Sequence, residues 1–260
     1  MAGEEDVKVI DEPSVAGPVA GTPVLVCFPS AGLASTIVGH YLIRSRSLPR
    51  CNSITSADMP PAAVVIESLP NPPMRVHGDA SLAIVVSEFP APPLAMTPIA
   101  RSVLDWVKRK QLGLVVVVEG ILRRQPTEGE VTEEQEPVPE AVIGIPATSF
   151  SKSILQRAGI PVLDQGLVGG IPAALLTVAA TANIPLVVLF VTANKADYPD
   201  HGAAAHILEA LSHLLPSLHL DPQPLFDQGR IIEHSLRDGM KMHEAAQTKP
   251  KSAQEPSIYG

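Results

Sequence analysis

Ser30 lies in a turn between a short apolar run and a stretch with helical spacing, the position that nucleophilic serines occupy in α/β hydrolases. The pattern of such a nucleophile elbow is G-x-S-x-G, and Phe28 stands where the first glycine is required. A large side chain crowds that strained turn. The sequence therefore favours Ser30 as a small residue that caps the helix starting near Leu33, with a nucleophilic serine as the alternative.

A second candidate is the glycine turn from Gly166 to Gly170, which follows a predicted strand and precedes a predicted helix. Turns of this kind hold phosphate in nucleotide-binding proteins, because the free N–H groups at a helix start attract anions. The turn has neither the G-K-[ST] ending nor the G-x-G-x-x-G register of such sites. We expect these glycines to allow tight backbone packing, and anion binding at residues 166–170 stays open.

The remaining titratable residues do not form a recognisable catalytic or metal-binding set. No two histidines are spaced i, i+4, and no H-E-x-x-H motif is present. Asp197, Asp200 and Asp221 stand near turns, where aspartate bonds to the local backbone. We therefore expect no metal, no cofactor and no catalytic residue. The histidines are His40, His77, His201, His206, His213, His219, His234 and His243.

The sequence ends in Ile258-Tyr259-Gly260, after a polar stretch rich in Lys, Pro, Ser, Gln and Glu. An apolar side chain, a tyrosine ring and a free carboxylate together form a short docking segment, which we call the plug. The two side chains can fill a pocket of a partner protein, and binding of a terminal carboxylate is a known mode of peptide recognition. Residues 246–257 contain no apolar periodicity, and Pro250 and Pro256 prevent a continuous helix. We expect residues 246–260 to be a disordered tail with a docking end, and the alternative is an ordinary frayed terminus.

Composition limits the class of protein. The 260 residues are 45% hydrophobic, which suffices for one large domain, and only 3% aromatic, which predicts an aliphatic core. A formal net charge of −8 argues against nucleic acid or an anionic membrane as partner. Cys27 and Cys51 form no C-x-x-C motif, so a disulfide or zinc site is not expected and a reducing cytoplasm fits.

One uncharged stretch between Asp164 and Lys195 invites the hypothesis of a membrane span. Glycines and prolines divide it into a helix over 172–182 and a buried strand over 185–192, each too short to cross a bilayer. The acidic run at 123–140 is predicted to be a solvated loop, and the alternative is a binding patch.

The elements alternate along the chain. Strands are predicted over 24–28, 62–66, 73–77, 81–87, 114–118, 141–145, 160–163 and 185–192, and helices over 33–43, 95–110, 149–158, 172–182, 200–215 and 222–245. This order predicts an α/β fold with a largely parallel mixed sheet. Residues 1–20 are interpreted as a flexible leader, 21–245 as one α/β domain, and 246–260 as the tail.

Taken together, the segments resemble the PAC2 family, the proteasome assembly chaperone 2 type of protein, in its archaeal single-domain form. The likeness covers about residues 22–240. It rests on the stretch Phe28–Ile43, where Ser30 and Ser35 replace two family glycines, on Met59-Pro60-Pro61, on the glycines of 166–170, and on Tyr198-Pro199-Asp200 with the alanines that follow.

This resemblance implies a three-layer α/β sandwich, similar to the phosphorylase- and hydrolase-like folds. It implies a cytoplasmic, non-enzymatic protein that forms oligomers with itself or with a paralogous subunit, and binds 20S proteasome α subunits as an assembly chaperone or activator. Some archaeal members carry a hydrophobic–Tyr–any-residue (HbYX) terminus that enters pockets between α subunits, and Ile258, Tyr259 and Gly260 match it. The alternative is a small-molecule phosphorylase, hydrolase or nucleotide-dependent enzyme on the same scaffold, because fold alone does not fix function.

Overall fold

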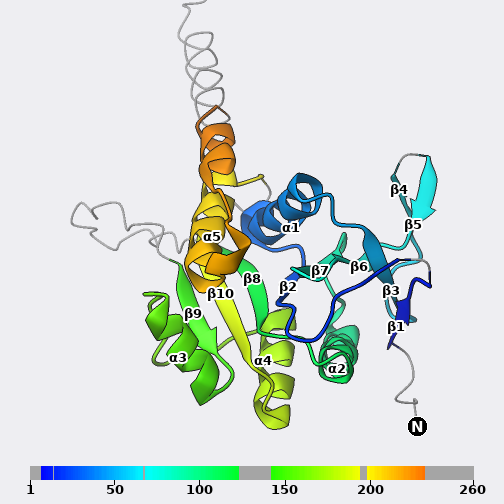
Figure 1. Cartoon of the computed structure of the whole chain (residues 1–260), viewed down its shortest axis with the longest axis horizontal. Helices are drawn as coiled ribbons and strands as arrows, with labels where there is room; N and C mark the ends of the chain where they lie inside the picture. The colour runs from blue at the N-terminus through cyan, green and yellow to red at the C-terminus, as the bar shows by residue number, and fades with distance from the viewer. Residues whose placement is uncertain (1–6, 14, 67, 123–141, 194–197, 232–260) are drawn as a thin grey trace, which may run out of the picture.

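The computed structural model describes residues 7–13, 15–66, 68–122, 142–193 and 198–231. These form one eight-stranded sheet and a separate two-stranded hairpin, with helices on both faces of the sheet (Figure 1). No helix in the described ranges is long and apolar enough to cross a bilayer. The strands are β1 (Val7–Asp11), β2 (Val24–Cys27), β3 (Arg50–Ser56), β4 (Val64–Ile66), β5 (Leu69–Asn71), β6 (Met74–Gly78), β7 (Ala83–Ser87), β8 (Val115–Leu122), β9 (Ile143–Pro146) and β10 (Leu186–Ala193). The α-helices are α1 (Ala34–Ser45), α2 (Pro93–Arg109), α3 (Ser149–Arg157), α4 (Gly170–Ala182) and α5 (His201–Leu214).

The sheet has the order β1-β3-β6-β7-β2-β8-β10-β9. Its centre, β7-β2-β8-β10, is parallel, and antiparallel strands extend it on both sides. Central parallel strands are covered on both faces, so they are apolar throughout rather than alternating. All four residues of β2 and the first four of β8 are buried accordingly.

The side chains of the central strands point alternately into two cores. One core packs against α2 and α4, and the other against α1, α3 and α5. The result is three layers, with α1 and α5 above the sheet and α2 and α4 below it in Figure 1. The prediction of a three-layer α/β sandwich with a mixed sheet is confirmed.

The structure differs from the predicted elements at several points, including the short strand β5, which was not predicted. Val7–Asp11, assigned to the flexible leader of residues 1–20, is an ordered edge strand that pairs with β3, because Val7 packs into the core and its carbonyl accepts a bond from Ser102. β3 itself was not predicted, since its sequence RCNSITS is mostly polar. Residues 160–163 make a single bridge, Gly144 to Val162, instead of a strand.

The helix predicted over 222–245 is present over residues 223–231, and the rest of it lies outside the described residues. The acidic run at 123–140 and the tail at 246–260 also lie outside them. The start of α5 agrees with its predicted cap: the Asp200 carboxylate accepts the N–H of Ala203 at 2.9 Å.

Candidate functional site

The turn between β2 and α1 carries Ser30, the candidate nucleophile. Its Oγ accepts the N–H of Gly120 on β8 at 3.0 Å and lies 3.0 Å from the Oγ of Ser35, which in turn donates to the carbonyl of Phe28. The two serines that replace family glycines therefore bond to one another. Ser30 precedes the short 3₁₀ turn Ala31–Leu33, but its side chain makes no capping bond, so the predicted capping role is wrong. The serine instead ties the turn to β8.

The same turn fills the crevice above β2 and β8. The next strand of the sheet after β2, β3, lies toward one edge of the sheet and the next after β8, β9, lies at the other edge, and open α/β sheets commonly bind ligands at such a switch point. Here the backbone of Ala31 lies directly over Gly120: a Cβ on Gly120 would come within 2.1 Å of the Ala31 carbonyl oxygen. The carbonyl of Gly32 also accepts the N–H of Asp200, which joins the turn to the start of α5. The crevice is occupied by the protein's own backbone.

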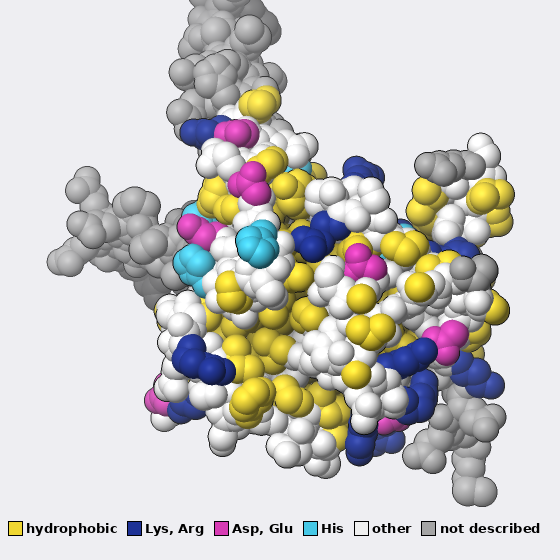
Figure 2. Space-filling model, viewed as in Figure 1, with side chains coloured by type: hydrophobic (Ala, Val, Ile, Leu, Met, Phe, Trp, Pro, Cys, Tyr) yellow, Lys and Arg dark blue, Asp and Glu magenta, His cyan; other side chains and the backbone are white. Residues whose placement is uncertain are grey.

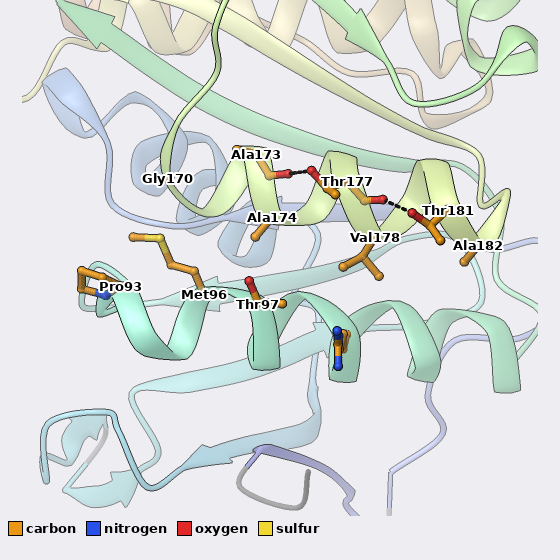
Figure 3. Close-up of a pocket in the computed structure, with 11 residues that line it drawn as sticks. Pro93, Met96, Thr97, Gly170, Ala173, Ala174, Thr177, Val178, Thr181 and Ala182 are labelled. Carbon is orange, nitrogen blue, oxygen red and sulfur yellow. Dashed lines mark hydrogen bonds between the residues drawn. The ribbon is translucent and has the colours of Figure 1, made fainter. Parts of the chain in front are cut away.

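The glycine turn of residues 166–170 leads into α4. Gly170 has a φ of +72°, a conformation that favours glycine, whereas a Cβ on Gly169 would meet no atom within 4 Å. Backbone conformation therefore accounts for Gly170, nothing in the structure requires a glycine at 169, and the predicted tight packing is found only at Gly166, whose Cβ would lie 2.8 Å from the Leu163 side chain. Gly170 borders an apolar groove of about 520 Å³ between α2 and α4 (Figure 3).

A cluster of charged side chains lies on the opposite side of the sheet and was not predicted. Arg75 on β6 is only 2% exposed, and its Nη2 donates to Glu88 Oε1 at 2.7 Å. His40 of α1 places Nε2 3.4 Å from the same oxygen. Arg75 Nε also donates to Nε2 of His77, whose Nδ1 lies 3.0 Å from the carbonyl oxygen of Leu48.

Two members of the cluster have pKa values shifted from their ordinary range. Hydrogen bonding from His40 and Arg75 lowers the pKa of Glu88 to about 2, although partial burial opposes this. Burial lowers the pKa of His77 from its usual range. A carboxylate held so firmly ionised is a poor general base, because proton transfer needs a pKa near the working pH. The arrangement suits an ion pair that holds β6, the end of β7 and α1 together.

This cluster forms the floor of a wide cavity of about 1000 Å³, which we call the α1 groove. Its walls include Ile37 and Tyr41 of α1 and Val65 of the β4–β5 hairpin, which projects from the body in Figure 1. Within the described residues, the Thr36 hydroxyl at its edge is buried without a hydrogen-bond partner. The groove thus combines apolar walls with a charged floor, a surface suited to contact with another molecule.

Sequence reasoning missed this cluster because its members are far apart in the chain. The one available signal was Arg75, an isolated charge in the apolar strand β6. Among the described residues no group of three or more His, Cys, Asp or Glu could hold a metal ion. The three predicted docking residues, Ile258, Tyr259 and Gly260, lie outside the described residues.

Comparisons with known proteins add the following. The sequence model of a family described as the PAC2 family matches residues 24–238. No curated protein matches the chain. Among solved structures, the fold is similar to Pyrococcus furiosus PbaA, described as an archaeal homologue of proteasome-assembly chaperone, with a TM-score of 0.79, 23% identity, and coverage of 94% of this chain and 96% of that one.

Two further structures share the fold. Pyrococcus furiosus PbaB, described as an archaeal proteasome activator, has a TM-score of 0.71 and 17% identity, and the match covers 91% of this chain and 99% of PbaB. Mycobacterium tuberculosis Rv2125, described as a proteasome-assembly chaperone homologue, has a TM-score of 0.60 and 16% identity, over 89% of this chain and 97% of that one. At these identities the likeness establishes the fold.

Proposed function

Because the chain belongs to the PAC2 family, we propose that it is a non-enzymatic protein that assists 20S proteasome assembly or activates the 20S particle. The observation that carries this proposal is the family match together with a whole-chain fold like that of PbaA and PbaB. The body self-associates, alone or with a paralogous subunit, and works in the cytoplasm.

The state of the candidate catalytic groups supports a non-enzymatic role. Ser30 bonds to Gly120 and Ser35, and no histidine or carboxylate is recorded within hydrogen-bond distance of it among the described residues. Nucleophilic catalysis by serine needs an adjacent base, which is missing from these contacts. The crevice where α/β enzymes commonly bind ligands holds the backbone of Ala31.

The contact with the proteasome is proposed to run through Ile258, Tyr259 and Gly260. Ile258 fills an apolar pocket between neighbouring α subunits, Tyr259 stacks and donates its hydroxyl, and the Gly260 carboxylate pairs with a lysine. If residues 246–257 behave as coil, their r.m.s. span is about 20 Å, enough to separate the plug from the body. Several tails on one oligomer would raise the apparent affinity through effective concentration.

The test is capture of archaeal 20S particles by the chain ending at Gly260. Losing an anchoring aromatic costs about 2 kcal/mol, roughly thirtyfold in affinity, so Tyr259→Ala is expected to abolish most capture. One residue added after Gly260 is expected to do similar damage, because it moves the carboxylate out of register. Ser257→Ala, one position outside the plug, is the matched control and should capture like the parent.

Two results would contradict the proposal. Equal capture and gate opening by the parent, Tyr259→Ala and the extended chain would make the tail an ordinary terminus. A robust esterase or phosphorylase turnover that disappears in Ser30→Ala would favour the enzyme alternative. Under the proposed function, Ser30→Ala captures 20S particles as the parent does.

A further inference from the structure

The β4–β5 hairpin is a small two-stranded sheet that presents apolar side chains to solvent. Val65, Ile66 and Leu69 are 69%, 41% and 67% exposed. In Figure 2 the hairpin stands apart from the body at the upper right, with hydrophobic side chains on both of its sides. Single exposed apolar residues are common on protein surfaces, but several of them gathered on one short hairpin form a patch, and such patches mark interaction sites.

The outer edge of β4 carries main-chain groups that have no strand to pair with. Val65 pairs with Pro70 in the centre of the hairpin. Because Pro70 has no N–H, these two residues form the non-hydrogen-bonded pair of the antiparallel ladder, and the N–H and C=O of Val65 point away from β5. Among the described residues β4 pairs with β5 alone. An edge of this kind can accept one further strand.

This edge borders the α1 groove. All three residues of β4 line the groove, whereas none of the three residues of β5 does. Another wall is one face of α1, on which Ile37, Tyr41 and Arg44 follow one another at the four- and three-residue intervals of a helical face. The groove has a volume of about 1000 Å³, which leaves room for a peptide in an extended conformation. The main chain of such a peptide can pair with Val65 while its side chains contact α1.

The charges of the groove favour a peptide that carries a carboxylate. Arg75 and Glu88 neutralise one another in the floor. Arg44 is exposed on the last turn of α1 and forms no ion pair with the described residues. With histidine neutral, the described residues that line the groove have a formal charge of +1, whereas the whole chain has −8. An anionic group is therefore attracted to this groove and repelled by most of the remaining protein.

We propose that the α1 groove binds an extended segment of a partner protein, which adds a strand to the free edge of β4. The occupant is a polypeptide because a strand edge is satisfied by the N–H and C=O groups of another main chain. The segment has apolar residues at alternate positions, since alternate side chains of a strand share a face and one face contacts Ile37 and Tyr41. A carboxylate of the segment pairs with Arg44. This contact goes beyond the proposed function and does not depend on the plug.

Fluorescence polarisation with the full chain tests the inference. The probe is a fluorescein-labelled peptide in which valine and glutamate alternate over about eight residues. The control peptide has lysine in place of glutamate, so that it keeps the main chain and the valines but reverses the charge. We expect saturable binding of the glutamate peptide with a dissociation constant below about 1 mM, and binding of the lysine peptide at least about tenfold weaker.

Two pairs of variants separate main-chain pairing from charge. Val65→Pro removes the outward N–H without removing a bond to β5, and it should weaken binding of the glutamate peptide about tenfold. Val65→Thr keeps the N–H and the β-branched shape, so it should bind within about twofold of the parent. Arg44→Glu should weaken the glutamate peptide about tenfold and strengthen the lysine peptide. Arg157→Glu, on the last turn of α3, is its matched control and should leave both affinities unchanged.

The inference is overturned if the glutamate peptide does not bind at about 1 mM, if folded Val65→Pro binds it as the parent does, or if the two peptides bind equally. Two further results would assign the groove to another occupant. Stronger peptide binding after deletion of residues 258–260 would mean that the chain's own end fills the groove. A changed sedimentation coefficient of Val65→Pro, with peptide binding unchanged, would mean that a second copy pairs with β4. The two proposals fail separately, because 20S capture by Tyr259→Ala tests the proposed function and peptide binding by Val65→Pro tests this inference.

Discussion

Replacing Arg75 by methionine is expected to cost about 3 kcal/mol of unfolding free energy. The side chain is 2% exposed and donates to Glu88, to His77 and to the carbonyls of Pro72 and Pro73. Methionine fills much of the volume but leaves the Glu88 carboxylate facing His40 alone. Removing one member of a buried pair typically costs 3–5 kcal/mol, and the lower end applies here because the Glu88 side chain is 24% exposed.

Urea unfolding at pH 7, followed by circular dichroism with linear extrapolation, measures this cost. Arg230→Met is the matched control, because Arg230 pairs with Asp227 on an exposed helical surface and such pairs contribute less than about 1 kcal/mol. Glu88→Gln is expected to cost roughly as much as Arg75→Met. The double variant should cost clearly less than the sum, because it leaves no uncompensated charge.

The pH dependence of stability gives an independent measure of the same cluster. The pKa of Glu88 is about 2 in the folded protein and 4.5 in the reference state, so its contribution is complete above pH 4.5 and is lost as pH falls toward 2. A shift of this size corresponds to about 3 kcal/mol at neutral pH. Glu88→Gln should remove that part of the acid-induced loss. If Arg75→Met costs no more than Arg230→Met, and Glu88→Gln leaves the acid profile unchanged, the cluster does not stabilise the fold as argued.

Two further predictions concern β8. Burial raises the pKa of Glu119 to about 7, so its effect has the opposite sign: stability falls as pH rises from 4.5 through 7, and Glu119→Gln should add about 3 kcal/mol at pH 8 but nothing at pH 4 in chemical unfolding. A flat difference between the two pH values would contradict this. Gly120→Ala should cost more than about 3 kcal/mol, because its Cβ would lie 2.1 Å from the backbone oxygen of Ala31. Gly169→Ala, whose Cβ meets nothing within 4 Å, should cost about 1 kcal/mol or less, and equal losses in thermal unfolding would refute the close approach.

The sequence was sufficient to predict a helix or strand wherever a local pattern of residues determines that element. β2, the first half of β8 and most of β10 are continuous apolar runs, and α5 begins at an aspartate cap. β1 was missed although Val7 and Val9 alternate with Lys8, because five residues after an acidic start give too short a pattern. β3 was missed because its order comes from pairing with β1 and β6 rather than from its own polar residues.

The charged cluster shows a different limit of sequence reasoning. His40, Arg75 and Glu88 come from a helix, a strand and the loop after a strand, and only the sheet order brings them together. A lone arginine in an apolar strand indicates that a buried partner exists, but it does not identify that partner. The Ser30–Gly120 contact is hidden for the same reason, since 90 residues separate its members.

The contacts of Ala31 and Ser30 with Gly120 also limit where this protein can bind a ligand or partner. Parallel α/β sheets commonly place function at the carboxyl ends of the central strands, because loops meet there without covering the crevice. In this chain the turn after β2 closes that position, with Ala31 packed over Gly120 and Ser30 bonded to its N–H. The surfaces left for binding include the α1 groove with the β4–β5 hairpin, and the groove between α2 and α4, which Arg101 borders. Because these grooves lie in opposite helical layers, a partner bound at one of them leaves the other free.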